Sequence, residues 1–215
     1  MCIRDSDSPS SPIPNSNLLI TKEKHVFLIV EKNKTTKLLS EKKLKQKQIV
    51  DPRYILDFFD KLKEGTILID EKTCSLYLEK VIEKKLKITK KEDPIYILKS
   101  IKNNIEIKNT INAHVIDGVA LTKFIYWIKN LKKLNITEVD AQNKLEKFRR
   151  MNSKYLFPSF NTIAGSGKNG AIVHYRATKN NTKLLKKNEI FLCDSGGQYK
   201  FCLLYTSDAA DDVRG

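Results

Sequence analysis

This 215-residue sequence lacks the features that mark several common classes of protein. No apolar run approaches the roughly 18 to 20 residues that a membrane-spanning helix needs, and no signal peptide is visible. The four cysteines include no C-x-x-C pair, so neither a zinc ribbon nor a disulfide framework is expected. These absences favour a cytoplasmic protein with no membrane partner.

Arginine is also scarce, supplying six of the 40 basic residues although the formal net charge is +15. Arginine is the residue best suited to forked contacts with phosphate. The lysines are spread along the chain among acidic neighbours, as in Glu79-Lys80 and Glu83-Lys84-Lys85, which is typical of solvated faces. We therefore expect no nucleic-acid partner and keep nucleic-acid binding only as a third hypothesis.

The two ends of the sequence differ in composition from the rest. The last fifteen residues contain no Lys, Ile or Asn, although Lys is frequent up to position 200. Residues 1–6 and 202–215 resemble translated sequencing adaptors, and residues 7–16 form a Ser/Pro-rich linker. We expect residues 1–14 to be a foreign end with a linker and residues 202–215 to be a foreign tail, so that the natural product is longer at both ends.

Residues 15–92 alternate short strands with helices, which predicts a small α/β domain. An N-capping Asp51 and a proline at the first helical position start the first of these helices. The expected strands are 18–20, 26–30, 66–69 and one from 86, and the expected helices follow Asp51-Pro52 and cover 72–85.

A second domain is expected over residues 93–201, because Asp93-Pro94 disfavours a continuing helix. It opens with a long amphipathic helix over 104–131 and a second helix from Thr137, which Asp140 caps reciprocally. The apolar face expected on the long helix consists of Ile107, Ile111, Val115, Gly118, Thr122 and Ile125. The second helix places Ala141, Leu145 and Phe148 on one side.

Glycine-punctuated strands are expected next, at 160–164, 171–174 and 190–193. The intervening "GSGKNG" at 165–170 lacks the spacing of a phosphate-binding loop. It predicts a tight hairpin-like connection in which Gly165, Gly167 and Gly170 take positive φ.

Two side chains in this region are candidates for chemistry. His174 ends the expected strand 171–174 and is either a structural or a functional residue, whereas a structural role is favoured for His114, and His25 begins a strand with no partner that the sequence supplies. Asp194 ends an apolar strand and is followed by Ser195 and two glycines. A buried carboxylate is costly unless a cation neutralises it, although Asp194 would also serve as a turn cap.

The segments "TIAGSGKNGAIVHYRAT" and "LKKNEIFLCDSGGQY" together resemble the catalytic domain of Xaa-Pro aminopeptidases of the long form, which carry two further domains upstream. The resemblance extends upstream through "SIKNNIEIKNTINAHVIDGVALTKFIYWI" and covers residues 7–201. It implies a creatinase-type middle domain followed by the first half of a pita-bread catalytic domain, an α/β (α+β) fold.

The resemblance further implies release of the N-terminal residue that precedes proline, through a hydroxide held between two divalent metal ions. Mn²⁺ is expected, with Zn²⁺ or Co²⁺ as alternatives. By resemblance, Asp194 is the first of five metal ligands, and His174 assists in substrate positioning and proton movement. The substrates are peptides with proline at the second position, and a homodimer of the intact protein is left open.

The sequence departs from the family after Asp194, where the next metal-binding Asp is expected about eleven residues later. Neither that Asp nor the later His and Glu ligands are present, and Asp208, Asp211 and Asp212 lack the surrounding motif. We therefore expect this chain to be an inactive fragment of a metallopeptidase. The alternatives are a prolidase or creatinase-type hydrolase, and a metal-free relative that binds peptides or proteins.

Overall fold

The computed structural model describes residues 14–200 and 202–204, and the chain divides into two compact units at Ile101 and Lys102. The helix α4 (Pro94–Ser100) falls within the first unit. The domain ranges 15–92 and 93–201 stay a prediction. Among the described residues, no helix has the length and apolarity needed to cross a membrane.

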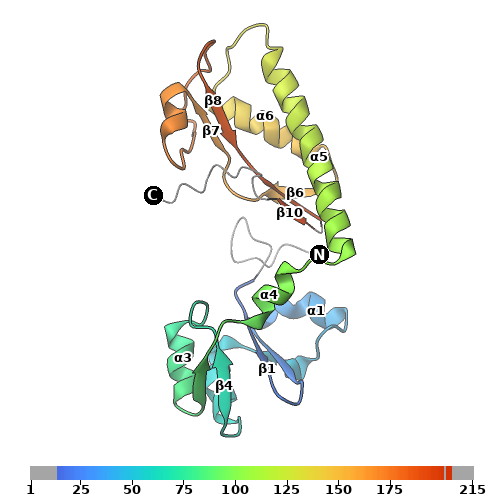
Figure 1. Ribbon diagram of the computed structural model, residues 1–215, viewed down its shortest axis with the longest axis vertical. Helices are drawn as coiled ribbons and strands as arrows, with labels where there is room; N and C mark the ends of the chain where they lie inside the picture. The colour runs from blue at the N-terminus through green and yellow to red at the C-terminus, as the bar shows by residue number, and fades with distance from the viewer. Residues whose placement is uncertain (1–13, 201, 205–215) are drawn as a thin grey trace. The chain divides into compact units, whose positions relative to one another are not determined.

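The first unit has the alternation of strands and helices that the sequence predicts (Figure 1). The strands β1 and β2 pair antiparallel, β3 pairs parallel to β2, and β4 pairs parallel to β5. The elements are β1 (Asn17–Ile20), β2 (Val26–Ile29), α1 (Thr36–Ser40), β3 (Ile49–Val50), α2 (Ile55–Asp60), β4 (Thr66–Ile69), α3 (Leu76–Glu83) and β5 (Lys87–Lys90). Short 3₁₀ turns, η2 (Lys32–Thr35), η3 (Gln46–Gln48) and η4 (Pro52–Tyr54), connect them.

One apolar core joins β2, α2, β4 and α3 of this unit. Its buried members are Ile29, Ile55, Phe59, Ile69, Leu78, Val81, Ile82 and Leu86. The expected cap at Asp51 is present, since its carboxylate accepts from the Arg53 amide. The helix expected over 72–85 begins only at Leu76, because Asp70 holds the preceding residues in a turn and Ser75 caps the helix.

The second unit consists of two long helices and two small antiparallel sheets, of order β7–β8 and β10–β9–β6 (Figure 1). Its elements are α5 (Asn104–Lys129), α6 (Glu138–Arg150), β6 (Tyr155–Pro158), β7 (Ile163–Ser166), η5 (Gly167–Ala171), β8 (Phe191–Asp194), β9 (Gly197–Tyr199) and β10 (Cys202–Leu204). The predicted capping box starts α6, with Thr137 and Asp140 exchanging hydrogen bonds of 2.8 and 3.1 Å.

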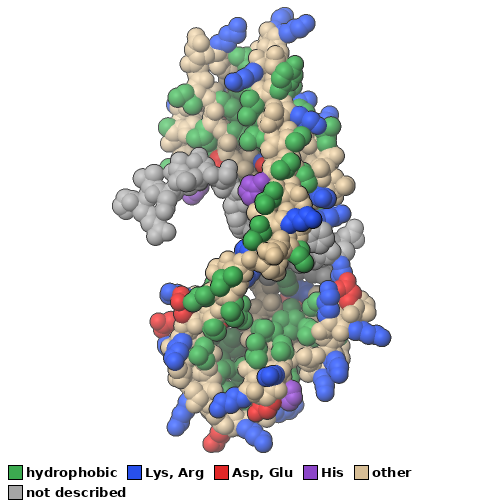
Figure 2. Space-filling model, turned by 45° about the vertical axis from the view of Figure 1, so that its right-hand side comes forward, with side chains coloured by type: hydrophobic (Ala, Val, Ile, Leu, Met, Phe, Trp, Pro, Cys, Tyr) green, Lys and Arg blue, Asp and Glu red, His purple; other side chains and the backbone are tan. Residues whose placement is uncertain are grey.

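The predicted buried face of α5 is wrong. Ile111 and Val115 of that face are 58% and 62% exposed, whereas Ala113, Ala120 and Phe124 are buried. Two apolar stripes run along this helix, and the buried one packs against β6 and β9 through Ala113 and against α6 through Phe124. Figure 2 shows hydrophobic side chains exposed along α5.

The glycine-rich region also differs from the prediction. Residues 171–174 form the end of η5 and a turn, not a strand. Of the three glycines expected to take positive φ, only Gly167 does, at 54°. Gly165 is required for a different reason: a Cβ there would lie 2.8 Å from the Gly170 amide nitrogen and 2.9 Å from the Asn169 carbonyl.

The predicted foreign ends lie mostly outside the described residues. The exception is β10, which the sequence assigned to a foreign tail but which pairs antiparallel with β9, Cys202 opposite Tyr199. The strand β6 was not predicted at all, and it borders the other edge of β9.

Candidate functional site

Asp194 is the last residue of β8 and pairs with Ile163 of β7. Successive side chains of a strand point to opposite faces. Phe191 and Cys193 pack against the buried cluster of α5 and α6, so Asp194 faces away from the helices. The residue is half-buried, and its Oδ1 atom is inaccessible to solvent. The carboxylate thus lies on the face of the β7–β8 sheet that the helices leave uncovered.

The first residue after β8, Ser195, lies on the helix side. Its hydroxyl oxygen lies 3.1 Å from Nη2 of Arg149, which donates to it. The same guanidinium donates from Nε and Nη2 to the two carboxylate oxygens of Asp117 on α5, at 2.8 and 3.2 Å. Asp117 also accepts a 2.6 Å hydrogen bond from the hydroxyl of Tyr199. The segment after Asp194 is therefore tied to both helices.

Burial opposes the charge of Arg149, whose side chain is 2% exposed. The hydrogen bonds and charge of Asp117 outweigh that effect and raise the pKa of Arg149 above its ordinary value. The guanidinium therefore stays charged. Burial also raises the pKa of the Cys193 thiol to about 11, so Cys193 is not a thiolate at neutral pH and does not suit a nucleophilic role.

A fully buried carboxylate, that of Glu138, organises the loop that precedes β8. It is 0% exposed and accepts from the amides of Ser166 and Lys183, the Asn169 side chain and the Tyr175 hydroxyl, at 2.7 to 3.3 Å. Burial opposes its charge, but these donors prevail and lower its pKa. Glu138 thus holds the backbone at Ser166, in the glycine-rich loop, and at Lys183, further along the connection to β8.

His174 lies in the turn after η5, exposed to solvent and with φ of 54°. The expected position at a strand end is therefore wrong. The neighbouring Tyr175 is buried and bonded to Glu138, which fixes the turn on which His174 stands. His114 is exposed on α5, with Nδ1 2.9 Å from the Thr110 carbonyl oxygen, and His25 is exposed just before β2.

The described residues do not by themselves form a dinuclear metal site. They include no group of three or more His, Cys, Asp or Glu side chains placed to hold a metal ion. Asp194 offers a carboxylate oxygen of the kind that Mn²⁺ accepts, but one ligand does not hold two ions.

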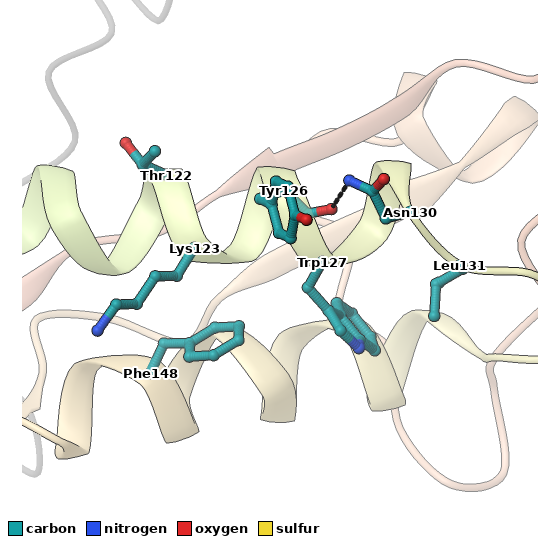
Figure 3. A pocket seen from close by; sticks show the side chains of 7 residues that line it. All are labelled: Thr122, Lys123, Tyr126, Trp127, Asn130, Leu131 and Phe148. Carbon is teal, nitrogen blue, oxygen red and sulfur yellow. Dashed lines mark hydrogen bonds between the residues drawn. The ribbon is translucent and has the colours of Figure 1, made fainter.

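A groove of about 520 Å³ lies between α5 and α6 (Figure 3). Trp127 and Phe148 line it, and Lys144 Nζ lies 5.2 and 5.1 Å from the centroids of their rings. The groove contains no acidic side chain and no residue of the Asp194 segment, so it is not part of the candidate metal site.

Sequence reasoning missed three residues of this site: Asp117, Glu138 and Arg149. A signal existed for two of them, because Glu138 and Arg149 continue the helical spacing of the buried Ala141 and Leu145. Charged residues are rarely fully buried, so helical spacing alone does not predict that Glu138 and Arg149 are.

Comparison with known proteins accounts for nearly the whole chain. Residues 1–106 match the model of the creatinase/prolidase N-terminal domain, and residues 108–211 match that of metallopeptidase family M24. The Xaa-Pro aminopeptidase ApepP of Drosophila melanogaster is 34% identical over 204 residues, which are 92% of this chain and 33% of that protein. The chain thus spans about a third of this relative's length.

Solved structures share the fold. The X-prolyl aminopeptidase of Caenorhabditis elegans, described as a cytosolic enzyme with a di-nuclear active site, superposes with a TM-score of 0.77 at 22% identity. The match covers 90% of this chain and 33% of that one. The prolidase of Pyrococcus furiosus gives a TM-score of 0.65 at 22% identity, over 86% of this chain and 55% of that one. The predicted architecture is confirmed: a creatinase-type domain precedes part of a pita-bread domain.

Proposed function

We propose that the full-length protein is a Xaa-Pro aminopeptidase. The premise is that the chain belongs to metallopeptidase family M24 and carries a creatinase-type N-terminal domain. Such an enzyme releases the N-terminal residue of a peptide whose second residue is proline. The likeness to the Drosophila enzyme over 92% of the chain supports this substrate class. The observation that carries the proposal is the position of Asp194, at the end of a strand whose other face is packed against helices.

In this proposal Asp194 is a ligand of one or both of two divalent ions, Mn²⁺ in preference to Zn²⁺ or Co²⁺. When bound, such ions polarise the scissile carbonyl. His174 takes part in positioning the substrate and moving a proton, and its exposed turn leaves it accessible to a peptide. Because the described residues provide only one of the ligands, the remaining ligands belong to the full-length protein.

It follows that the 215-residue chain alone does not hydrolyse Xaa-Pro peptides. We also place the full-length protein in the cytoplasm, since the C. elegans neighbour is described as cytosolic. Nucleic acids and membranes are not among the proposed partners, and the lysines are assigned to solvated faces.

A prolidase is the second candidate, because the fold superposes on a prolidase about as well as on several aminopeptidases. The two differ in substrate: a prolidase cleaves dipeptides, whereas an aminopeptidase also accepts longer chains. A metal-free relative that binds peptides is the third candidate, and it would bind Xaa-Pro peptides without turnover.

The decisive experiment compares wild-type full-length protein with Asp194→Asn on a Xaa-Pro dipeptide and a Xaa-Pro pentapeptide. We expect turnover of both peptides, abolished by Asp194→Asn and unaffected by Asp57→Asn, which changes an exposed Asp of α2 in the other unit. Wild-type turnover in Asp194→Asn would overturn the role of Asp194. Cleavage of the dipeptide alone would favour the prolidase, and no cleavage of either would favour the metal-free relative.

A further inference from the structure

Asp194 stands between two residues that are both anchored to the helices. Before it, Cys193 packs against the buried cluster formed by Phe124, Ala141 and Leu145. After it, Ser195 accepts a hydrogen bond from Arg149. Because both neighbours are fixed on one face, the backbone torsions that aim the Asp194 side chain at the other face are fixed as well.

The buried guanidinium of Arg149 is suited to holding Ser195, and with it the backbone next to Asp194, in place. Its Nε and Nη2 atoms bind both oxygens of Asp117, and Nη2 has a further proton for Ser195. The side chain is 2% exposed, so water does not compete for these hydrogen bonds. A lysine at this position would offer a single ammonium, which does not reproduce the planar, two-pronged contact with Asp117 while reaching Ser195.

The hydrogen bonds of Arg149 and Asp117 reach a second residue after Asp194, Tyr199. The hydroxyl of Tyr199 donates to Asp117 Oδ1 at 2.6 Å, so one carboxylate on α5 restrains both Arg149 and the end of β9. Ser195 and Tyr199 are thus both tied to the pair formed by Arg149 and Asp117, one from each end of the Gly196-Gly197-Gln198 stretch. The backbone between them is held further by the Ser159 amide, which donates to the Gly196 carbonyl at 3.1 Å.

We propose that Asp117, Arg149 and Ser195 form a positioning relay that fixes the Asp194 carboxylate for metal binding. The inference rests on the proposed function, since it assumes that Asp194 is a ligand. None of the three relay residues needs to touch the metal or the substrate. Loss of an interaction that orients a ligand typically weakens metal affinity about 10-fold to 100-fold.

The test measures Mn²⁺ affinity in the full-length protein, by the electron paramagnetic resonance signal of the free ion, and thermal unfolding of the same samples. Ser195→Ala removes only the accepting hydroxyl and leaves the Arg149–Asp117 pair intact. We expect it to bind Mn²⁺ about 10-fold more weakly or worse, with an unchanged unfolding midpoint. Arg149→Lys should weaken binding at least as much.

Ser159→Ala is the matched control. Ser159 is buried, at 4% exposure, whereas Ser195 is half-buried, and the Ser159 hydroxyl makes no hydrogen bond among the described residues. Removing it deletes the same chemical group close to the same segment, and we expect wild-type Mn²⁺ affinity.

Chemical rescue separates positioning from a general structural effect. In Arg149→Ala, millimolar guanidinium should restore Mn²⁺ affinity, because it fills the vacated site and donates to both Asp117 and Ser195, whereas ammonium should not. If Arg149→Ala does not fold, Ser195→Ala decides the question alone.

Wild-type Mn²⁺ affinity in Ser195→Ala, together with loss of Mn²⁺ binding in Asp194→Asn, would overturn the relay. Wild-type affinity in Asp194→Asn itself would overturn the proposed function, and the relay with it. The two failures are therefore distinguishable in one set of titrations.

Discussion

The rings of Tyr155 and Tyr199 meet edge to face, with centroids 5.4 Å apart and planes at 66°, directly over the backbone of Gly197. A Cβ at Gly197 would lie 2.9 Å from Cε2 of Tyr155 and 3.0 Å from Cε2 of Tyr199. Both rings are fixed, because the hydroxyl of Tyr155 bonds to Glu146 and that of Tyr199 to Asp117. The second glycine after Asp194 is therefore required by packing.

Gly197→Ala should destabilise the second unit by about 1–3 kcal/mol, the usual cost of overpacking a tight site. The matched control is Gly118→Ala in α5, where a Cβ meets nothing within 4 Å. That change should raise stability by about 0.5–1 kcal/mol, because alanine loses less backbone freedom than glycine in a helix. Urea unfolding followed by fluorescence of Trp127, the single tryptophan, measures both. Equal stability of the two variants would contradict the packing argument.

Glu138→Ala should lower the free energy of unfolding by about 3 kcal/mol or more, since it leaves several buried donors without their acceptor. Glu138→Gln keeps one acceptor oxygen and should cost less. The same fluorescence titration compares them. Substitution of an exposed carboxylate usually changes the free energy of unfolding by less than about 0.5 kcal/mol. A loss as small as that in Glu138→Ala would show that Glu138 is not the centre of this network.

Acidification provides an independent test of Glu138. Its pKa in the folded protein lies below the ordinary value of 4.5, so its contribution to stability is complete above pH 4.5 and disappears as the pH falls through the folded pKa. The unfolding free energy should therefore decrease more steeply as the pH falls below about 4.5 in the wild type than in Glu138→Gln. Parallel pH profiles for the two proteins would argue against a lowered pKa at this site.

Chelation tests the metal requirement of the full-length protein. Prolonged dialysis against a chelator should abolish hydrolysis of Xaa-Pro peptides, and added Mn²⁺ should restore it. The 215-residue chain should remain inactive at every Mn²⁺ concentration, because its described residues include one candidate ligand and no cluster of three. Activity that survives removal of metal, verified by elemental analysis, would exclude a metallopeptidase.

Helix caps and secondary-structure elements were predictable from the sequence where an interaction between residues close in the chain determines them. The caps at Asp51 and Thr137 involve partners two or three residues away, and both are present as expected. The strand 66–69 and the helix with Leu78, Val81 and Ile82 follow from hydrophobic spacing alone. The resemblance of two short motifs identified the fold.

The sequence did not reveal which apolar stripe of α5 is buried, because Ile111 and Val115 recur at a helical spacing just as Ala113, Ala120 and Phe124 do. Nor did spacing reveal that Gly165 is required by the approach of Asn169, or that His174 stands in a turn. The burial of α5 depends on segments distant along the chain, and the turn at His174 is held by the distant Glu138 through Tyr175, whereas the approach of Asn169 to Gly165 is a backbone geometry that residue spacing does not encode.

The sequence by itself determined that Asp194 ends an apolar strand and precedes two glycines, since the order of residues and the alternation of a strand suffice for that. The tertiary structure decided on which face of the β7–β8 sheet the Asp194 carboxylate lies. Ser195 is held by Arg149 of α6, 46 residues earlier in the chain, and Arg149 is held by Asp117 of α5, 78 residues before Ser195. Their hydrogen bonds exist only when α5, α6 and β8 are packed together, and no local pattern encodes that meeting.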